Sequence, residues 1–396
     1  MKRLLVLAAG ILQVPVIKKA RDLGYYVIAA DGNRNAVGFK YADKVIVANI
    51  TSEEEMLKIA QDENIDGVIH PCSEVSMSVM GRINEELKLH GINRDTAIRA
   101  TNKCRMRQAF DSYGAPSPLF YCSSEVEEGY SFFQKINGTA ILKPSRNSGS
   151  RGVSKLNADL PYHDFTHLFE RAIRESRDAS VMIEQFIEGP EFSVEIIIWQ
   201  GVVNVLQVTD KKTTGAPYFV ELGHSQPSLF PQEVVDAIKD AAFRGVRALG
   251  LDNCAAHAEV KYQNGRAYLM EIGARLGGDF ISTELTRLST GIDMVAAAIN
   301  VALGIVPNLH PNVEHRGVAI RYMTPPPGVV ISINGAENLK SQEVYDAEIY
   351  VKEGNIINEV KSSVDRSGHV IVTSTTVSDA ITKAEKLISL VQIKTE

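Results

Sequence analysis

Short apolar runs and amphipathic segments alternate along the first ninety residues of the chain. The apolar runs have the composition of strands that are buried on both faces, and they span 3–9, 25–31 and 66–70. The segments that follow them predict helices over 15–24, 52–64 and 74–91. Alternating strands and helices of this length predict an α/β fold, in which helices cover both faces of a parallel sheet.

Polar residues stand where two of these strands end. Asp31 closes the second strand, and Pro71, Cys72, Ser73 and Glu74 follow the third. Ligands of parallel sheets bind at the carboxyl ends of the strands, which makes these positions candidates for a binding site. Two structural alternatives stay open, because Asp31 could cap a turn and Glu74 could cap the next helix.

The pattern changes after Thr101. A helix over 101–114 and a proline-rich connection over 116–124 lead into a small mixed unit. Its predicted elements are a helix over 126–136, strands over 139–145 and 152–156, a helix over 163–176 and a strand over 180–187. A compact unit that carries a flexible glycine and serine segment predicts a mobile lid.

The segment ILKPSRNSGSRGVSKL, residues 141–156, joins a lysine to many small residues that expose backbone donors. Such a segment favours binding of a polyanion to backbone N–H groups. It does not match the P-loop pattern, and Gly10 alone near the N-terminus does not make a dinucleotide fingerprint. The anion site must therefore involve residues elsewhere in the chain.

Two further stretches carry acidic residues in apolar surroundings. Glu184 and Glu191 flank a Gly-Pro turn between two predicted strands. A carboxylate in such a place needs a partner, either the vicinal hydroxyls of a ribose or a basic side chain. Glu259 and Glu271 lie on the two strands of a predicted hairpin around Asn264-Gly265.

The turn of this hairpin decides whether its two acids meet. A two-residue turn pairs Glu259 with Met270 and places the acids on opposite faces, whereas a three-residue loop over 263–265 makes them diagonal neighbours on one face. Two converging carboxylates would form a site for Mg²⁺. The apolar neighbours of both acids favour this metal site over a solvated surface.

Composition narrows the class of protein. The 396 residues are 44% hydrophobic and 23% charged, which is ordinary for a soluble chain of several domains. The net charge of -6 argues against a general nucleic-acid binder. The apolar stretch near the N-terminus contains Gln13 and Pro15 and is too short for a membrane span. Four widely spaced cysteines predict neither a disulfide framework nor a zinc site, and a reducing, cytoplasmic location fits.

Residues 101–304 resemble ATP-grasp enzymes in the order of their motifs. This order is two lysines (Lys103 and Lys143), the glycine and serine segment, a glutamate suited to a ribose (Glu191), and the carboxylate pair of Glu259 and Glu271. The similarity is greatest to carboxylate–amine ligases, which include L-amino acid ligases and purine-pathway enzymes. The N-terminal α/β unit resembles their Rossmann-like pre-grasp domain, and residues 366–391 resemble the small C-terminal domain of the biotin carboxylase-like branch. The resemblance implies a pre-grasp domain over 1–95, an ATP-grasp domain over 96–310 with its lid near 115–185, and a small α+β domain over 311–396.

The resemblance also implies roles for individual residues. Lys103 and Lys143 would bind the α- and β-phosphates of ATP, and Lys211, in preference to Lys212, would lie near the γ-phosphate. Arg275 would bind the substrate carboxylate and then the acyl phosphate. The other implied contacts are Ser148, Gly149, Ser150 and Gly152 to the phosphates, Glu184, Gln185 and Ile187 to adenine, Glu191 to the ribose, and Glu259 and Glu271 to Mg²⁺ or Mn²⁺.

The chain departs from the family at one metal position and resembles it at another site. ATP-grasp enzymes commonly have Glu-x-Asn-x-Arg after the hairpin, whereas this chain has Gly273, so that a water or a substrate oxygen would replace the ligand. Glu221 and His224 are similar to a Glu-x-x-His of L-amino acid ligases. By that resemblance Glu221 would bind an ammonium and His224 would orient or deprotonate the nucleophile, with an ordered loop as the structural alternative.

The resemblance implies an ATP-dependent carboxylate–amine ligase. A carboxylate would attack the γ-phosphate of ATP to give an acyl phosphate and ADP, and an amine would then displace phosphate to form an amide. The partners would be a small acid, such as an amino acid, and a small amine, with no nucleic acid or membrane, and a homodimer is compatible with the family. A carboxylate–thiol ligase, a purine-pathway ligase and a nucleotide-binding regulator without turnover remain alternatives.

Overall fold

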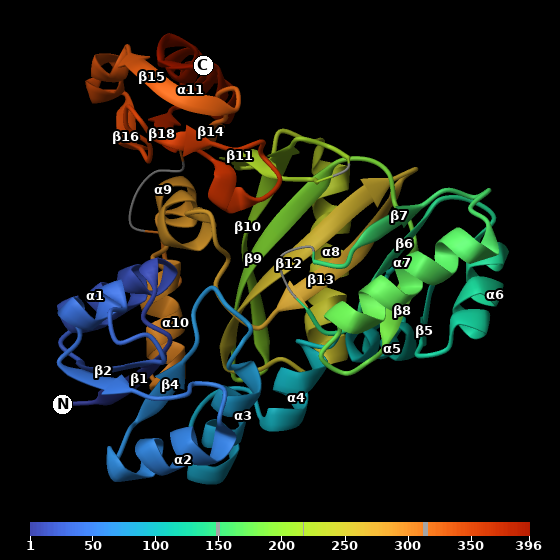
Figure 1. Cartoon of the computed structure of the whole chain (residues 1–396). Coiled ribbons are helices and arrows are strands. Elements are labelled where there is room, and N and C mark those ends of the chain that lie inside the picture. The colour runs from blue at the N-terminus through green and yellow to red at the C-terminus, as the bar shows by residue number, and fades with distance from the viewer. Residues whose placement is uncertain (148–150, 217, 312–315) are drawn as a thin grey trace.

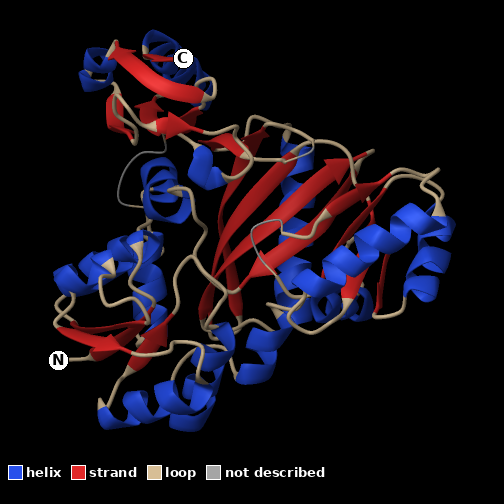
Figure 2. Cartoon of the chain, in the orientation of Figure 1, coloured by secondary structure: helices blue, strands red, loops and turns tan. Residues whose placement is uncertain are grey.

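The computed structural model describes residues 1–147, 151–216, 218–311 and 316–396. Figure 1 shows four parts: an N-terminal unit in blue, a lid in green, a large central sheet, and a C-terminal unit in orange and red. Figure 2 shows helices lying beside the sheets. The mixed α/β architecture agrees with the fold class that the sequence predicts.

The N-terminal unit contains the predicted parallel sheet, in the order β3-β2-β1-β4. Its strands are β1 (Arg3–Leu7), β2 (Tyr26–Asp31), β3 (Lys44–Val47) and β4 (Gly67–Ile69), of which β3 was not predicted. Its helices are α1 (Val14–Asp22), α2 (Glu53–Asp62), α3 (Met77–Leu87) and α4 (Arg94–Arg99), with 3₁₀ turns η1 (Ile11–Gln13) and η2 (Val37–Tyr41). Ser52 caps α2 by accepting a hydrogen bond from the Glu55 N–H, and Leu4 to Leu7 are fully buried because helices cover both faces of β1.

The lid is a separate antiparallel sheet in the order β5-β8-β6-β7. Its elements are β5 (Phe120–Ser123), α6 (Val126–Ile136), β6 (Ala140–Pro144), β7 (Ser154–Leu156), α7 (Tyr162–Glu175) and β8 (Val181–Gln185). The strand β5 lies where the sequence predicted only a connection. A buried cluster that includes Phe133, Phe165 and Phe169 joins the two helices to the sheet, so that the lid has a core of its own.

The central sheet is antiparallel throughout and runs in the order β13-β12-β9-β10-β11-β14-β18-β16. Its strands are β9 (Glu191–Trp199), β10 (Val202–Thr213), β11 (Glu221–Gln226), β12 (Cys254–Gln263), β13 (Arg266–Gly273), β14 (Gly317–Met323), β16 (Val344–Ile349) and β18 (Gly368–Ser374). The sheet therefore continues through the domain boundary that the sequence predicted at residue 310.

Helices fix this sheet to the other parts. The helices α5 (Lys103–Tyr113) and α8 (Gln232–Leu249) pack together, with α8 on β12 and β13. The helix α10 (Met294–Ala302) contacts β9 and β12 as well as α1 and β4, so it joins the sheet to the N-terminal unit. The remaining elements are η3 (Ile281–Leu285), α9 (Thr286–Thr290), β15 (Gly328–Asn334), η4 (Ala336–Lys340), β17 (Ile356–Ile357), η5 (Ser363–Asp365), α11 (Val377–Leu390) and β19 (Gln392–Thr395).

Two of the four cysteines are joined. Cys104 in α5 and Cys122 in β5 form a disulfide, with their Cα atoms 6.0 Å apart, whereas Cys72 and Cys254 are free. The sequence predicted no disulfide framework, and this single bond between Cys104 and Cys122 was not foreseen. Their separation of 18 residues hides the contact, because the chain turns back between the helix and the strand.

Candidate active site

A cavity of about 590 Å³ lies between the lid, the central sheet and the C-terminal unit. Most of the residues predicted for the site line it, namely Lys103, Lys143, Glu184, Gln185, Ile187, Glu191, Lys211, Glu221, Glu259, Glu271 and Arg275. Gly152 and His224 are not part of its wall. Ser148, Gly149 and Ser150 lie outside the described residues.

The first lysine stands at the N-terminus of α5. Asn102 caps this helix by accepting a hydrogen bond from the backbone N–H of Arg105, which fixes where the helix begins. The Lys103 ammonium donates to the Asn147 carbonyl at 3.1 Å and lies 3.5 Å from a carboxylate oxygen of Glu271. The side chain thus bridges the base of the lid and the acidic hairpin.

The second lysine is part of a buried ion cluster in the lid. Lys143 on β6 pairs with Glu184 on β8, and Arg107 from α5 donates to the other Glu184 oxygen at 2.8 Å. Burial lowers the pKa of Lys143, although the charge of Glu184 opposes this shift. Both Glu184 oxygens are therefore taken by cations, so this carboxylate positions Lys143, whereas the resemblance implied a contact to adenine.

Arg107 is a site residue that the sequence reading missed. It is fully buried, and besides Glu184 it donates to the Met270 carbonyl at 2.7 Å. A signal was present, because Arg107 follows Lys103 by one helical turn and thus shares its face of α5.

The segment after β8 crosses from the lid to the central sheet. Gln185, Phe186 and Ile187 line the cavity, and the backbone N–H groups of the first two donate to Leu119 and Thr139. The Ile187 carbonyl accepts from the Lys261 ammonium at 3.3 Å. This segment thus offers apolar side chains and backbone peptide groups, which are the groups that could pack on and bind a flat base such as adenine.

Lys211 on β10 lies at the centre of three carboxylates. Its ammonium is 2.5 Å from Glu191, 3.4 Å from Glu259 and 3.6 Å from Glu221. Burial opposes its charge, but the three acids outweigh burial and raise the pKa of Lys211 well above its usual range. Lys212 instead forms an exposed pair with Glu385, so only Lys211 reaches the cavity.

The two acids of the hairpin meet, by a route that neither sequence alternative described. The turn has two residues, because Gln263 pairs with Arg266, and Asn264 and Gly265 both have positive φ. A β-bulge at Met270 then shifts the register, and Glu259 pairs directly with Glu271. The bulge places both carboxylates on one face of the hairpin.

These acids suit a hard cation. The charge of Lys211 lowers the pKa of Glu259 to about 2, so its carboxylate is ionised at neutral pH. Oxygen ligands are those that Mg²⁺ prefers, with substrate phosphates and water completing its shell. Within the described ranges, no group of three or more His, Cys, Asp or Glu side chains is arranged to hold a metal ion.

Arg275 connects the hairpin to the N-terminal unit. Its guanidinium lies 3.2 Å from Glu74, which follows the third predicted strand and does not cap α3. A Cβ atom at Gly273 would lie 3.1 Å from the Arg275 side chain, so the glycine makes room for it. Asp31, at the neighbouring strand end, accepts instead from the backbone of Ala9 and Asn33 and thus holds a turn.

His224 lies behind the wall of the cavity. It is buried, and its Nε2 is 3.2 Å from Asp279. Asp279 also accepts hydrogen bonds from both terminal nitrogens of Arg366, at 2.7 and 2.8 Å. Burial opposes ionisation, but the hydrogen bonds from Arg366 and His224 hold the pKa of Asp279 well below its usual range. Ser363, close to Arg366, donates to Glu221 at 2.9 Å, so the C-terminal unit fixes this side of the site.

His257 is a second residue that the sequence reading missed. It lines the cavity, and its Nδ1 lies 2.5 Å from the buried Glu195, whose other oxygen accepts from Ser282 at 2.6 Å. A Cβ atom at Gly277 would lie 2.5 Å from the imidazole, which explains why glycine stands there. The sequence contained one signal for His257, because it lies two residues from Glu259 and alternate residues of a strand share a face.

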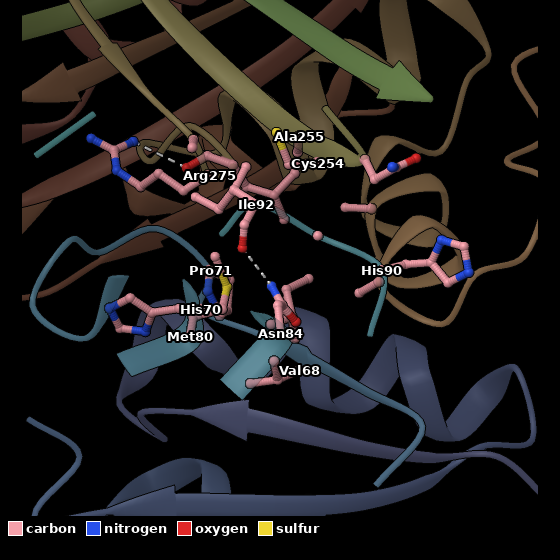
Figure 3. Close-up of a pocket in the computed structure, with 17 residues that line it drawn as sticks. Val68, His70, Pro71, Met80, Asn84, His90, Ile92, Cys254, Ala255 and Arg275 are labelled. Carbon is pink, nitrogen blue, oxygen red and sulfur yellow. Dashed lines mark hydrogen bonds between the residues drawn. The ribbon is translucent and has the colours of Figure 1, made fainter. Parts of the chain in front are cut away.

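A much smaller cavity of about 30 Å³, enough for one water, is lined by Arg275 and by residues of the N-terminal unit such as His70 and Asn84 (Figure 3). Two atoms of its lining residues, the buried Nε of Arg275 and Oδ1 of Asn84, have no hydrogen-bond partner in the described part of the chain. His70, on the same wall, is held between the Leu7 carbonyl and the Ser76 N–H. Burial lowers the pKa of His70 to about 4, and the charge of Arg275 adds to the effect.

Comparison with known families agrees with this geometry. The sequence profile of the ATP-grasp domain matches residues 136–284, and that of L-amino acid ligase C-terminal domain 2 matches residues 321–396. The chain therefore contains an ATP-grasp domain. Its C-terminal part matches a domain of L-amino acid ligases. Enzymes with an ATP-grasp domain use ATP with Mg²⁺. In this cavity the Glu259–Glu271 pair offers oxygen ligands that suit the metal, and the lysines offer positive charge that suits the phosphates.

Individual ATP-grasp proteins are similar over most of this chain. The alanine–anticapsin ligase of Bacillus subtilis is 25% identical over 74% of this chain and 66% of its own length. The formate-dependent phosphoribosylglycinamide formyltransferase of Methanocella arvoryzae is 24% identical over 99% of this chain and 92% of its own. The crystal structure of L-amino acid ligase from Bacillus licheniformis superimposes with a TM-score of 0.84 at 22% identity, covering 100% of this chain and 99% of that one. This ATP-grasp chain has, among its described helices, none long and apolar enough to cross a membrane.

Proposed function

We propose that the chain is an ATP-dependent ligase that joins a small carboxylic acid to a small amine through an acyl phosphate, and releases ADP and phosphate. The observation that carries the proposal is one cavity that brings together Lys103, the Glu259–Glu271 pair and Arg275. Phosphoryl transfer needs positioned cations around the phosphates more than it needs a covalent catalyst. The similarity to an alanine–anticapsin ligase and to an L-amino acid ligase supports small molecules of the amino-acid class as substrates.

The phosphate side is held by three lysines. Lys103 and Lys143 would bind the α- and β-phosphates, each already oriented by a carboxylate of the protein. Lys211 would turn toward the γ-phosphate, since it now neutralises acids that a metal would take over. Glu259 and Glu271 would hold Mg²⁺, which would neutralise phosphate charge when bound.

The acid would bind beside Arg275. A guanidinium grips a carboxylate through two parallel hydrogen bonds and can keep one of them as the carboxylate becomes an acyl phosphate. Glu221 would bind an ammonium of the substrate. Neither His224 nor its partner Asp279 lines the cavity, so His224 would act only indirectly, through the Asp279–Arg366 pair behind the wall.

The test is a matrix of acids and amines with ATP and Mg²⁺. We expect ADP and phosphate to form in equal amounts and to depend on both substrates, and hydroxylamine to trap the acyl phosphate as a hydroxamate. AMP and pyrophosphate would refute the acyl phosphate. Product formation with thiols in place of amines would favour the thiol ligase, and nucleotide binding without turnover on any pair would favour a regulator.

A further inference from the structure

The Cys104–Cys122 disulfide ties the lid to the body of the molecule. Cys104 is the second residue of α5, directly after Lys103, and α5 packs against α8 on the central sheet. Cys122 lies in β5, the edge strand of the lid sheet, opposite Met182 of β8. The bond therefore links the helix that carries a phosphate-binding lysine to the outer strand of the lid.

The bond also spans a hinge. The chain enters the lid through residues 114–119 and leaves it through 186–190, and the two connections lie side by side, because the Gln185 N–H donates to the Leu119 carbonyl at 2.8 Å. The disulfide closes a loop around the first connection. A lid that rotates on these two segments must turn against this covalent tie.

The other two cysteines are poor competitors for an oxidant. Burial raises the pKa of Cys72 to about 11 and that of Cys254 well above its usual range, so neither forms much thiolate at neutral pH. Cys122 is half-buried, as Cys72 is, but Cys122 lies within bonding distance of Cys104. Proximity thus favours reaction of the Cys104–Cys122 pair.

We propose that Cys104 and Cys122 form a reversible disulfide that restrains the lid and slows turnover. The oxidant is a low-molecular-weight disulfide. Its own sulfur–sulfur bond breaks as one forms between Cys104 and Cys122, and the two protons of the cysteine thiols leave on the two small thiols that result. A small thiol reverses the reaction. The effect on turnover rests on the proposed ligase function, because lid opening and closing recur in each catalytic cycle.

The experiment compares the full chain after treatment with glutathione disulfide and after reduction. Mass spectrometry of alkylated protein counts free thiols, hydrogen exchange of lid peptides is followed with and without ADP and Mg²⁺, and ADP release is measured with substrates. We expect the oxidised protein to have two free thiols, a smaller response of the lid to nucleotide, and a several-fold lower turnover that reduction restores. The Cys122→Ser variant should keep the reduced behaviour under both treatments, and Cys254→Ala should respond like the wild type.

Two outcomes would overturn the proposal. One is four alkylatable thiols after oxidation, and the other is a formed bridge with unchanged lid exchange and unchanged turnover. A chain that turns over no substrate but has a lid whose exchange depends on the bridge would refute the proposed ligase and leave the restraint intact.

Discussion

Glu259 and Glu271 face each other directly across the hairpin, because the bulge at Met270 restores the register that a two-residue turn would spoil. The sheet thereby presents two carboxylates side by side where their neighbours are apolar. Mutual repulsion is offset by a lysine on each acid, Lys211 on Glu259 and Lys103 on Glu271. A divalent cation between the acids would release both lysines for phosphate.

Removing one of these carboxylates should weaken metal binding. Glu271→Gln should lower the affinity for Mn²⁺ in the presence of nucleotide by more than the about 10–100-fold that loss of an outer-shell partner costs. Electron paramagnetic resonance of free Mn²⁺ measures this directly. The exposed Glu188→Gln serves as the matched control, and equal affinities in the two variants would remove the acid pair from the metal site.

Arg275 should separate chemistry from nucleotide binding. Arg275→Lys keeps a positive charge beside Glu74 but loses the planar pair of donors. We expect ATP affinity within a few-fold of the wild type and a loss of about 2–4 kcal/mol of transition-state stabilisation, the scale for one preorganised donor. Nucleotide titration and steady-state ADP release measure the two effects. Turnover near the wild-type rate would leave Arg275 as a structural partner of Glu74 only.

The ion pair between the C-terminal unit and the central sheet should be structural. Arg366→Gln leaves Asp279 with His224 alone, in a place where the arginine side chain is 9% exposed and the aspartate 22%. Loss of one partner of such a pair costs about 3 kcal/mol of unfolding free energy. The exposed pair of Lys212 and Glu385 is the control, since Lys212→Gln should cost under about 1 kcal/mol. Urea unfolding measures the free energy of unfolding of both variants. Equal losses of unfolding free energy would contradict a structural role for the pair of Arg366 and Asp279.

Acid should destabilise the protein through His70. Its folded pKa of about 4 lies below the unfolded value of 6.5, so the unfolded chain binds the extra proton first. The stabilisation is fully present above pH 6.5, and up to about 3 kcal/mol is lost as the pH falls toward 4. The measurement is urea unfolding between pH 7 and pH 4.5, in the wild type and in His70→Gln. The variant should be less stable at pH 7 and should have a shallower pH dependence, and parallel pH curves would show that His70 titrates normally.

The sequence by itself determined the elements and the order of the chemistry. Apolar runs predicted β1, β2 and β4 as buried strands, because strands covered on both faces have this composition. The two lysines, the hairpin acids and Arg275 could be named in advance, since each stands in a local pattern of recognisable spacing. The domain limits and the substrates stay predictions.

Only the tertiary structure decided which charges meet. Arg107 and Glu184 are 77 residues apart, and Arg366 and Asp279 are 87 apart, so no periodicity along the chain encodes either pair. The Met270 bulge likewise depends on how β12 packs between β9 and β13, and the disulfide depends on how the lid folds back on α5. Local spacing controls which face of a strand or helix a side chain occupies, whereas long-range packing controls which faces come together, and the site forms where several such faces meet.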